Sequence, residues 1–469
     1  MKTAAELYEL GQRDLHALVA YTISLQERVA LNSRNSGKPP VTDGYAKPAP
    51  KSLRGNSGKK TGGQPGHTGA TLKPVEIPDK TEIHPLSKCP CGCGCDLSGQ
   101  PPLGYESRQV FDLPPQKLIV TEHRVEIKRC PLSGELVRAP WPTGVTAPVQ
   151  YGPDFLAWLV YLNTQQFIPL ARIDQMSFDL FGQHVSQDTI LNAIRTVGQG
   201  LTPFSAAIEE LIQQEPVVGA DETGLRVNNK LHWLHILCAA DWTWYGVHQK
   251  RGREALDSFG ILPEYEGRLV HDCWQTYLEL NCMHALCNAH ILRELVFIHE
   301  QCNQEWAKSL FELLLEMNNE RNEHKLVASC FPKERMLQWH QQYKAILVLG
   351  RDMNPQILPP ADAPKKRGRK KQTKAQNLLD RLEQHEDWVL AFLHDFEVPF
   401  TNNQSEQDAR MMKVKQKVSG CFRTFEGAET FATIRSYIKT LRKQGQQIFQ
   451  GLKSAIQGNP FIPQATQSG

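Results

Sequence analysis

Three acidic residues stand where their carboxylates could converge. Asp221 follows the apolar run VVGA and Asp272 follows the apolar run RLVH, and each run is typical of a buried strand. Glu406, in the segment NNQSEQDAR, would add a third acid from a later helix. Carboxylates suit Mg²⁺ or Mn²⁺, and two such ions can drive displacement at a phosphodiester. The acids therefore predict a two-metal site that is strained or partly protonated without its ions.

A dense basic segment follows Glu406. Its cations are Arg410, Lys413, Lys415, Lys417 and Arg423. A solvated helix of mixed charge is one interpretation, and a surface that holds DNA phosphates beside the carboxylates is the other. The acid triad favours the second interpretation and leaves Asp408 as a surface acid.

Further candidate phosphate contacts lie elsewhere in the chain. Arg293 is one of them, and the tract PKKRGRKK supplies several more, for which a solvated loop is the alternative. The cations of that tract are Lys365, Lys366, Arg367, Arg369, Lys370 and Lys371.

Cysteines suggest two further sites. Cys89, Cys91, Cys93 and Cys95 crowd together, and a single Cys130 follows in CPLSG. Because zinc ribbons usually pair two Cys-x-x-Cys knuckles, this pattern predicts either a ribbon with structural Zn²⁺ or a degenerate one without metal. Cys287 and His290 lie three residues apart in CNAHILREL. A metal site is one interpretation of this pair, but the absence of a clear second pair favours a packing or DNA-positioning role.

Composition and charge are those of a globular protein. The 469 residues are 40% hydrophobic and 22% charged, enough for roughly two to four domains. The net charge is only +3, so basic groups must act through clusters. The N-terminal MKTAAELYELGQRDLH lacks the apolar core of a signal peptide, and no apolar run is long enough to cross a bilayer. We expect a cytoplasmic, nucleoid-associated protein with no membrane partner.

The first 210 residues are expected to form four segments. Residues 1–35 predict a helix, either a short coiled coil or an ordinary packed helix, and residues 36–80 predict a basic flexible linker. Residues 81–150 read as a Cys-rich, zinc-ribbon-like small β domain with the strand-like runs RQVFDL and KLIVTEHRVEIKRC. Residues 151–210 are expected to be helical and to bind DNA.

Residues 151–210 show a helix-turn-helix layout. Gly182 marks a turn, and Ser186 is placed to cap the second helix. That helix would turn Gln187, Asp188 and Asn192 toward DNA bases. A helical hairpin that only packs is the alternative.

The rest of the chain alternates strands and helices. Residues 211–300 contain three successive strand-like runs, then a helix and two more strands, which predicts an α/β core with a mixed sheet. Residues 301–395 read as a helical insertion with the basic tract 365–371, because the gap between Asp272 and Glu406 is far longer than one helical connection needs. Residues 396–450 are expected to be the C-terminal helices of the core, and 451–469 a tail.

Several motifs, taken in order, resemble the IS66-family insertion-sequence transposases. They are NSRNSGKPP, GGQPGHTG, GADETGLRV, LVHDCW, CNAHILREL and PFTNNQSEQDARMMKVKQKVSGCF, and they span residues from about 30 to about 450. The resemblance implies an RNase H-like catalytic core, interrupted by the insertion, with an Asp–Asp–Glu triad at Asp221, Asp272 and Glu406. The chain departs from the family pattern at RCPLSG, which has one cysteine where two are usual.

The resemblance implies a DDE transposase. Such an enzyme would free 3′-hydroxyl ends of its insertion sequence and join them to target DNA, with two Mg²⁺ (or Mn²⁺) ions as cofactors. DNA, further copies of the chain and small accessory proteins encoded beside it are the expected partners. The alternatives are a structure-specific nuclease on the same core and an inactive, domesticated DNA-binding protein.

Overall fold

The computed structural model describes residues 72–355 and 372–464, together with a few isolated residues between 12 and 25. Apart from those few, the predicted helix over 1–35, most of the predicted linker over 36–80 and the basic tract 365–371 lie outside the described residues. The chain divides into two compact units, Lys47–Thr121 and Met1–Ala46 with Glu122–Gly469.

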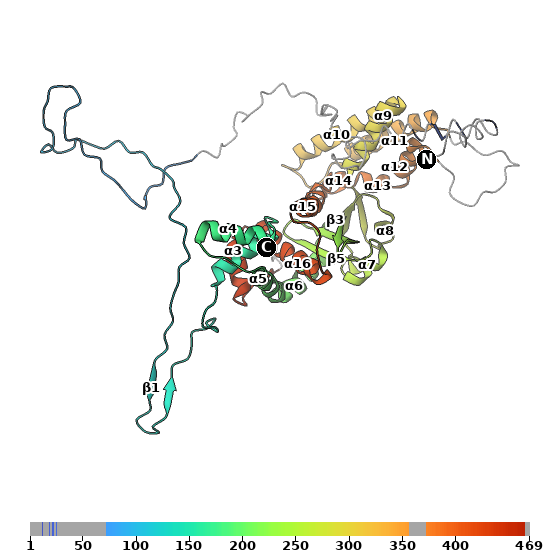
Figure 1. Cartoon of the computed structure of the whole chain (residues 1–469). Helices are drawn as coiled ribbons and strands as arrows, with labels where there is room; N and C mark the ends of the chain where they lie inside the picture. The colour runs from blue at the N-terminus through green and yellow to red at the C-terminus, as the bar shows by residue number, and fades with distance from the viewer. Residues whose placement is uncertain are drawn as a thin grey trace. The chain divides into compact units, whose positions relative to one another are not determined.

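A mixed five-stranded sheet lies among the helices of the larger unit (Figure 1). Its strand order is β5-β4-β3-β6-β7. Its strands are β3 (Val217–Val227), β4 (Lys230–Cys238), β5 (Thr243–His248), β6 (Arg268–His271) and β7 (Met283–Leu286). The pairs among β3, β4 and β5 are antiparallel, and the pairs among β3, β6 and β7 are parallel. Asn228 and Asn229 form the two-residue turn between β3 and β4, both with positive φ, as such hairpins require. The predicted mixed sheet is confirmed.

The register of β3 and β6 brings two of the acids side by side. Their parallel pairing ends at Gly219 and Val270, and Asp221 and Asp272 each lie two residues further along. Asp272 follows the end of β6, as expected. Asp221 does not end its strand, because β3 continues to Val227 along β4. The parallel pairing of β3 with β6 ends at Gly219 instead. From Asp221 onward, β3 therefore has a partner strand only on the side of β4.

One group of helices packs with the sheet around Val218, Ala220 and Leu237. These helices are α3 (Pro153–Thr164), α4 (Leu170–Phe181), α5 (Gln187–Gly200), α6 (Thr202–Gln214), α16 (Phe425–Lys443) and α17 (Ile448–Ile456), and the short α7 (Arg253–Phe259), η2 (Leu262–Glu264) and α8 (Gln275–Leu278) lie between strands. Gly182 ends α4 in a left-handed conformation, and Ser186 Oγ accepts a hydrogen bond from Thr189 N at the start of α5.

A second group of helices shares a core with β6 and β7 around Val270, Ala285 and Leu286. It comprises α9 (Asn288–Cys302), α10 (Glu305–His324), α11 (Lys333–Met353), α12 (Lys374–Gln384), α13 (Glu386–Val389) and α14 (Ala391–His394). The following helix, α15 (Asn403–Ser419), returns to the sheet, where Ala409 and Met412 are buried in one cluster with Leu225 and Leu234.

The region 81–150 contains less sheet than its sequence predicts. Its described strands are β1 (Ile127–Arg129) and β2 (Leu136–Arg138), and Lys88 and Asp96 form an isolated bridge. The predicted strands at RQVFDL and at the start of KLIVTEHRVEIKRC are therefore wrong. Val110 and Val120 are both 90% exposed, so β-prone side chains there find neither a partner strand nor a buried face.

Asp408 is not the surface acid that its neighbours suggested. Its side chain is fully buried and pairs with Lys439 of α16, and Oδ2 accepts hydrogen bonds from Cys238 Sγ and Gln404 Nε2, each at 3.3 Å. The pair therefore ties α15 to α16 through the core of the larger unit.

Removing this buried acid should destabilise the fold. Asp408→Ala leaves the Lys439 ammonium without its counter-charge, and we expect the free energy of unfolding to fall by about 3–5 kcal/mol. Gln407→Ala, an exposed change on the same helix, should cost less than about 0.5 kcal/mol. Urea denaturation followed by tryptophan fluorescence measures both, and equal midpoints would contradict a structural role for Asp408.

Candidate active site

Asp221 lies largely buried at the open edge of β3. Burial is the largest cause that raises its pKa to about 7, and the charge of the adjacent Glu222 is the next. The charges of Asp272 and Glu406 raise it further, and a hydrogen bond from Glu222 N to Oδ1 at 2.8 Å opposes the rise. The charges of Asp272 and Glu406 therefore act on Asp221, but burial is the main reason why its pKa of about 7 leaves it partly protonated at neutral pH without a metal.

Asp272 occupies the turn after β6 and is exposed. Its Oδ1 accepts a hydrogen bond from Trp274 N at 3.1 Å. Cys273 between them has φ 68°, an unfavourable conformation for a residue with a side chain, and its N–H donates to His271 Nδ1 at 3.1 Å. This tight turn holds the exposed carboxylate beside the buried one.

Glu406 reaches the same place from the first turn of α15, and its side chain is 13% exposed. Two arginines face it, with Arg293 Nη2 at 3.4 Å and Arg410 Nη2 at 3.5 Å from Oε2. Cys287 Sγ and His290 Nδ1 each lie 3.7 Å from Oε1. The structure thus brings the predicted Cys-x-x-His element and Arg293 to the third acid.

Asn402 sets the position of α15 against β3. It stands at the N-cap of α15, but its side chain does not cap that helix and Nδ2 donates to Ala220 O at 2.7 Å instead. Gly219 makes this approach feasible, because a Cβ at that position would lie 2.3 Å from Asn402 Oδ1 and 2.7 Å from Ser405 Oγ. Sequence reasoning missed both residues, although a glycine inside a strand is a signal of close backbone approach.

Glu222 is a fourth acid that sequence reasoning missed. Its side chain is 3% exposed, and Tyr277 Oη donates to it at 2.6 Å while Arg251 Nε donates at 2.9 Å. Burial raises the pKa of Glu222 despite these partners. The Arg251 guanidinium lies 5.0 Å from the Trp233 ring and 4.4 Å from the Trp274 ring, so cation–π contacts hold it beside the turn that carries Asp272.

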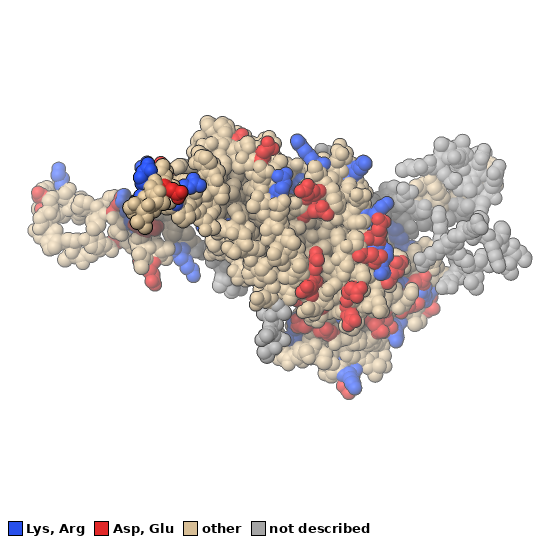
Figure 2. All heavy atoms as spheres, turned by 90° about the horizontal axis from the view of Figure 1, so that it is seen from below, with Lys and Arg blue, Asp and Glu red and all other residues tan. Residues whose placement is uncertain are grey.

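The basic residues of α15 differ in exposure. Arg410, Lys417 and Arg423 are exposed, and Lys413 Nζ donates to Gly224 O at 2.8 Å. Lys415 is buried: its Nζ donates to Gly420 O at 3.1 Å, lies 3.7 Å from the Phe422 ring, and has its pKa lowered to about 8 by burial. The prediction that Lys415 contacts phosphate is wrong, since its ammonium closes the end of the helix. Figure 2 shows basic and acidic side chains interspersed over one face of the molecule.

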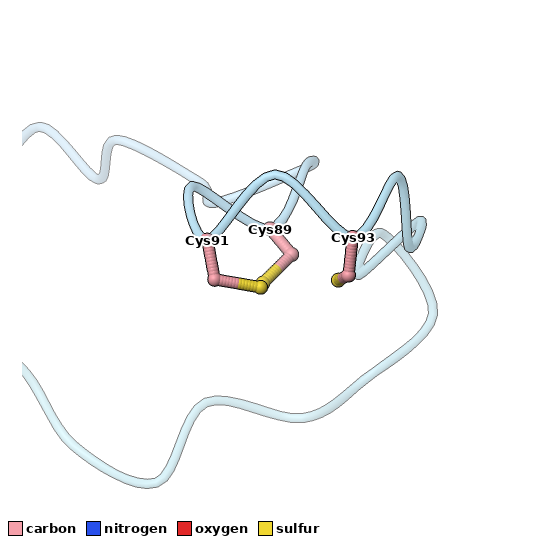
Figure 3. Close-up of side chains that lie close together, drawn as sticks. All are labelled: Cys89, Cys91 and Cys93. Carbon is pink, nitrogen blue, oxygen red and sulfur yellow. The ribbon is translucent and has the colours of Figure 1, made fainter.

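The smaller unit carries a separate cysteine cluster. The sulfurs of Cys89, Cys91 and Cys93 lie within 4.8 Å of one another, with 2.9 Å between the first two (Figure 3). Gly92 and Gly94 have φ of 84° and 77°, which curl the loop so that alternate cysteines meet. The pKa of the Cys93 thiol is lowered to about 6, mainly by a hydrogen bond from the backbone of Cys95 and further by hydrogen bonds with the neighbouring cysteine side chains. This thiol therefore ionises readily.

Two further predicted ligands are not members of that trio. Cys95 is exposed outside the cluster, and its carbonyl accepts a hydrogen bond from Cys89 N at 3.1 Å. Cys130 belongs to the larger unit, at the turn between β1 and β2, and Ser133 N donates to its sulfur at 3.5 Å. Three thiols that meet in one loop are suitable ligands for Zn²⁺.

Among the described residues, no helix is both long enough and apolar enough to cross a membrane.

Comparisons with known proteins place these features in a family. The model of the transposase IS66 family matches residues 148–430, which contain all three acids. The zinc-finger binding domain of transposase IS66 matches residues 87–131, and a family of unknown function matches residues 4–73. The search of curated proteins finds no match. The resemblance found in the sequence motifs is confirmed, and the zinc-finger match together with the three-cysteine cluster supports a structural zinc site.

The raised pKa of Asp221 predicts how stability depends on pH. An unfolded Asp ionises near pH 4 and the folded Asp221 near pH 7, so folding binds a proton in this window and ionised Asp221 costs stability above it. Asp221→Asn keeps an acceptor for Glu222 N, and it should raise the free energy of unfolding at pH 8 in EDTA by about 2–4 kcal/mol. The gain should vanish toward pH 4.

Denaturation midpoints across this pH range test the prediction, with the exposed Asp179→Asn as the matched control. Addition of Mg²⁺ should stabilise the wild type and the control but not Asp221→Asn, because binding to the folded state alone raises stability. A pH-independent effect of Asp221→Asn would show that its carboxylate is not the destabilising group.

Proposed function

The chain belongs to the IS66 family of transposases, and from that premise we propose that it is a DDE transposase that cleaves the ends of its own insertion sequence and transfers the freed 3′-hydroxyl ends to target DNA. What supports the proposal is that the charges of Asp272 and Glu406 both act on Asp221, at the edge of the sheet where the parallel pairing of β3 and β6 ends. A strand, a turn and a helix distant in sequence supply the three acids. Three mutually repelling carboxylates have a use in an enzyme that binds cations and none in a passive DNA-binding protein.

The proposed core is RNase H-like. What supports this is the strand order β5-β4-β3-β6-β7, with antiparallel strands on one side of β3 and parallel strands on the other. The helices α10 to α14 would then belong to the insertion over residues 301–395, between α9 and the helix that carries Glu406.

The three acids fit two Mg²⁺ or Mn²⁺ ions, because each offers only carboxylate oxygens. Burial first, and then the charges of Glu222, Asp272 and Glu406, raise the pKa of Asp221, and a bound cation would offset both effects. When bound, the ions would activate the attacking oxygen and stabilise charge on the leaving oxygen. Arg293 and Arg410 orient Glu406 and leave positive charge beside the phosphate that is cut. Asp221, protonated at lower pH, must lose its proton before it can act as a ligand.

Each step breaks one P–O bond and forms another. Cleavage forms the new bond to a water oxygen, and strand transfer forms it to a 3′-hydroxyl oxygen. In cleavage, a water oxygen bonds to phosphorus as the bond to the 3′ oxygen breaks, and that oxygen leaves as a 3′-hydroxyl. In strand transfer, the 3′-hydroxyl oxygen bonds to a target phosphorus as the bond to the target's own 3′ oxygen breaks. That oxygen leaves as a 3′-hydroxyl, and the proton lost by the attacking hydroxyl is balanced by the one it takes up. No external energy source is needed, since the number of P–O bonds is unchanged.

Recognition and assembly belong to other parts of the chain. We propose that α4 and α5 bind DNA in the manner of a helix-turn-helix, with Gln187, Asp188 and Asn192 exposed on α5. The zinc-finger region would contact the ends of the element as well. Joining two ends requires two active sites held together, so the working form would be a homo-oligomer on DNA, with accessory proteins as further partners.

Strand cleavage is the direct test. The full-length protein should cut DNA that spans the gene's own flanks at fixed positions in Mg²⁺ and not in EDTA. Glu406→Gln and Asp272→Asn should each lower the cleavage rate at least about 100-fold, because each removes charge that acts on the transition state. DNA affinity should stay nearly unchanged, and Asp241→Asn should cut like the wild type.

The products separate the alternatives. Cleavage without joining of the 3′ ends to a second DNA would indicate the structure-specific nuclease. Specific binding without metal-dependent cleavage, even with the neighbouring gene products added, would indicate the inactive DNA-binding protein.

Two exposed cations, Lys417 in the last turn of α15 and Arg423 after the helix, predict a salt effect. Lys417→Ala combined with Arg423→Ala should lower the slope of log K against log salt by about 2, because each lost phosphate contact contributes about 0.9. The loss of affinity should be similar on specific and unrelated DNA. The control is the double variant Lys308→Ala with Lys333→Ala, which removes the same charge from exposed sites on α10 and α11 and should leave the slope unchanged. Equal slopes in the two double variants would exclude a phosphate contact by Lys417 and Arg423.

A further inference from the structure

Cys287, His290 and Glu406 form a mixed cluster of metal-ligand types at the junction of α9 and α15. Cys287 is the N-cap of α9, and His290 follows three residues later, so both face the same side of the chain. The sequence offered no second pair of ligands for this element. The fold supplies the missing ligand from Glu406, more than a hundred residues later in the chain.

The spacing of the three ligand atoms is close to that of a tetrahedral zinc site. Zn–S bonds of about 2.3 Å and Zn–N and Zn–O bonds of about 2.0–2.2 Å place neighbouring ligand atoms about 3.4–3.6 Å apart. Cys287 Sγ and His290 Nδ1 each lie 3.7 Å from Glu406 Oε1, and all three atoms lie within 4.8 Å of one another. Two of the three distances between ligand atoms are thus within a few tenths of an ångström of those in a zinc site, and the third is at most 4.8 Å.

Two observations point to a bound cation at this place. His290 Nδ1 is buried and has no hydrogen-bond partner among the described residues, since 3.7 Å to Glu406 Oε1 is too long for a hydrogen bond. Asn402 N donates to Cys287 Sγ at 3.1 Å, a hydrogen bond that favours the thiolate form needed for metal ligation and partly opposes the burial that raises the pKa of this thiol to about 11. The His290 nitrogen, which has no hydrogen-bond partner among the described residues, and the Cys287 sulfur, which accepts a hydrogen bond, thus both lie next to the Glu406 carboxylate.

We propose that Cys287, His290 and Glu406 bind Zn²⁺, or another thiophilic divalent cation, and that this binding inhibits DNA cleavage by withdrawing Glu406 from the magnesium site. The inference rests on the proposed function, in which Glu406 is a catalytic ligand. On binding, the Cys287 thiol loses its proton to solvent, and Sγ, Nδ1 and Oε1 each donate an electron pair to the cation. A water molecule completes four-coordination.

Ligand chemistry selects the cation. Thiolate and imidazole favour Zn²⁺ over Mg²⁺, which prefers oxygen ligands, so Mg²⁺ would not compete for Cys287 and His290. The guanidinium of Arg293, 3.4 Å from Glu406 Oε2, loses part of its contact with Glu406 when the carboxylate turns to the cation. This cost makes the site weaker than the closed structural site expected at Cys89, Cys91 and Cys93, so that inhibition is reversible.

Cobalt binding tests the site without reference to activity. Co²⁺ replaces Zn²⁺ in such sites, and its thiolate ligation gives a charge-transfer absorption that can be titrated in the full-length protein. Cys287→Ser should lose one bound Co²⁺ relative to the wild type, as should His290→Gln, which serves if the first variant does not fold. Cys302→Ser, at the other end of α9, is the matched control and should bind as much Co²⁺ as the wild type. Any Co²⁺ bound by the cysteines of the smaller unit should be the same in all of these proteins. Unchanged stoichiometry and absorption in Cys287→Ser would overturn the proposal.

Zinc inhibition tests the consequence. At fixed Mg²⁺, the Zn²⁺ concentration that halves cleavage should rise at least about 10-fold in Cys287→Ser, relative to that variant's own activity in Mg²⁺ alone, and should not change in Cys302→Ser. Equal inhibition of both would overturn the regulatory role even if Co²⁺ binds. Absence of cleavage by the wild type in Mg²⁺ would refute the proposed function instead, and the cobalt titration would still decide whether the metal site exists.

Discussion

The close approach of α15 to β3 is the contact on which the candidate site depends. Asn402 Nδ2 bonds to Ala220 O, one residue before Asp221, and Gly219 leaves the space that the Asn402 and Ser405 side chains fill. Asn402 N also donates to Cys287 Sγ, so the same residue joins the start of α15 to the start of α9. Three segments far apart in sequence thereby meet at one point, and the third acid follows one turn later. A side chain at residue 219 would push the helix away from the strand and separate Glu406 from Asp221.

Such convergence places negative charge where water is partly excluded. Burial and the neighbouring acids raise the pKa of Asp221 to about 7, and the same burial raises the pKa of Glu222. The surroundings offset this charge unevenly: Arg251 and Tyr277 bind Glu222, and Arg293 and Arg410 face Glu406. Asp221, between them, has no cationic partner among the described residues in contact with it. The fold thus leaves Asp221 as the acid of this group whose charge has no cationic partner among the described residues, which agrees with the cation site proposed for it.

Much of this arrangement could be predicted from sequence, because its signals are local. The apolar runs before Asp221 and Asp272 predicted the strands, Gly182 and Ser186 predicted a turn and a cap, and the ordered motifs identified the family. What sequence could not supply are contacts set by long-range packing. Lys415 belongs to a run of basic residues in the sequence, but its ammonium donates a hydrogen bond to Gly420 O just after the helix and its side chain is buried. Val110 and Val120 favour strands, but no partner strand reaches them. Cys287 and His290 lacked a visible third ligand because Glu406 joins them only in the folded chain.

The two acids of α15 show why spacing along a helix matters more than composition. Residues two apart on a helix point about 200° away from each other, so Glu406 and Asp408 face opposite environments. Glu406 faces α9 and the open edge of the sheet, where it contacts several partners at 3.4 to 3.7 Å and none at close hydrogen-bonding distance. Asp408 faces the core and is held by Lys439. The tight buried pair fixes the helix, and this leaves the loosely held Glu406 able to exchange its arginines for a cation without loosening the fold. Asp408, which the sequence indicated as a surface acid, is therefore the residue that fixes the helix from which Glu406 would bind a cation.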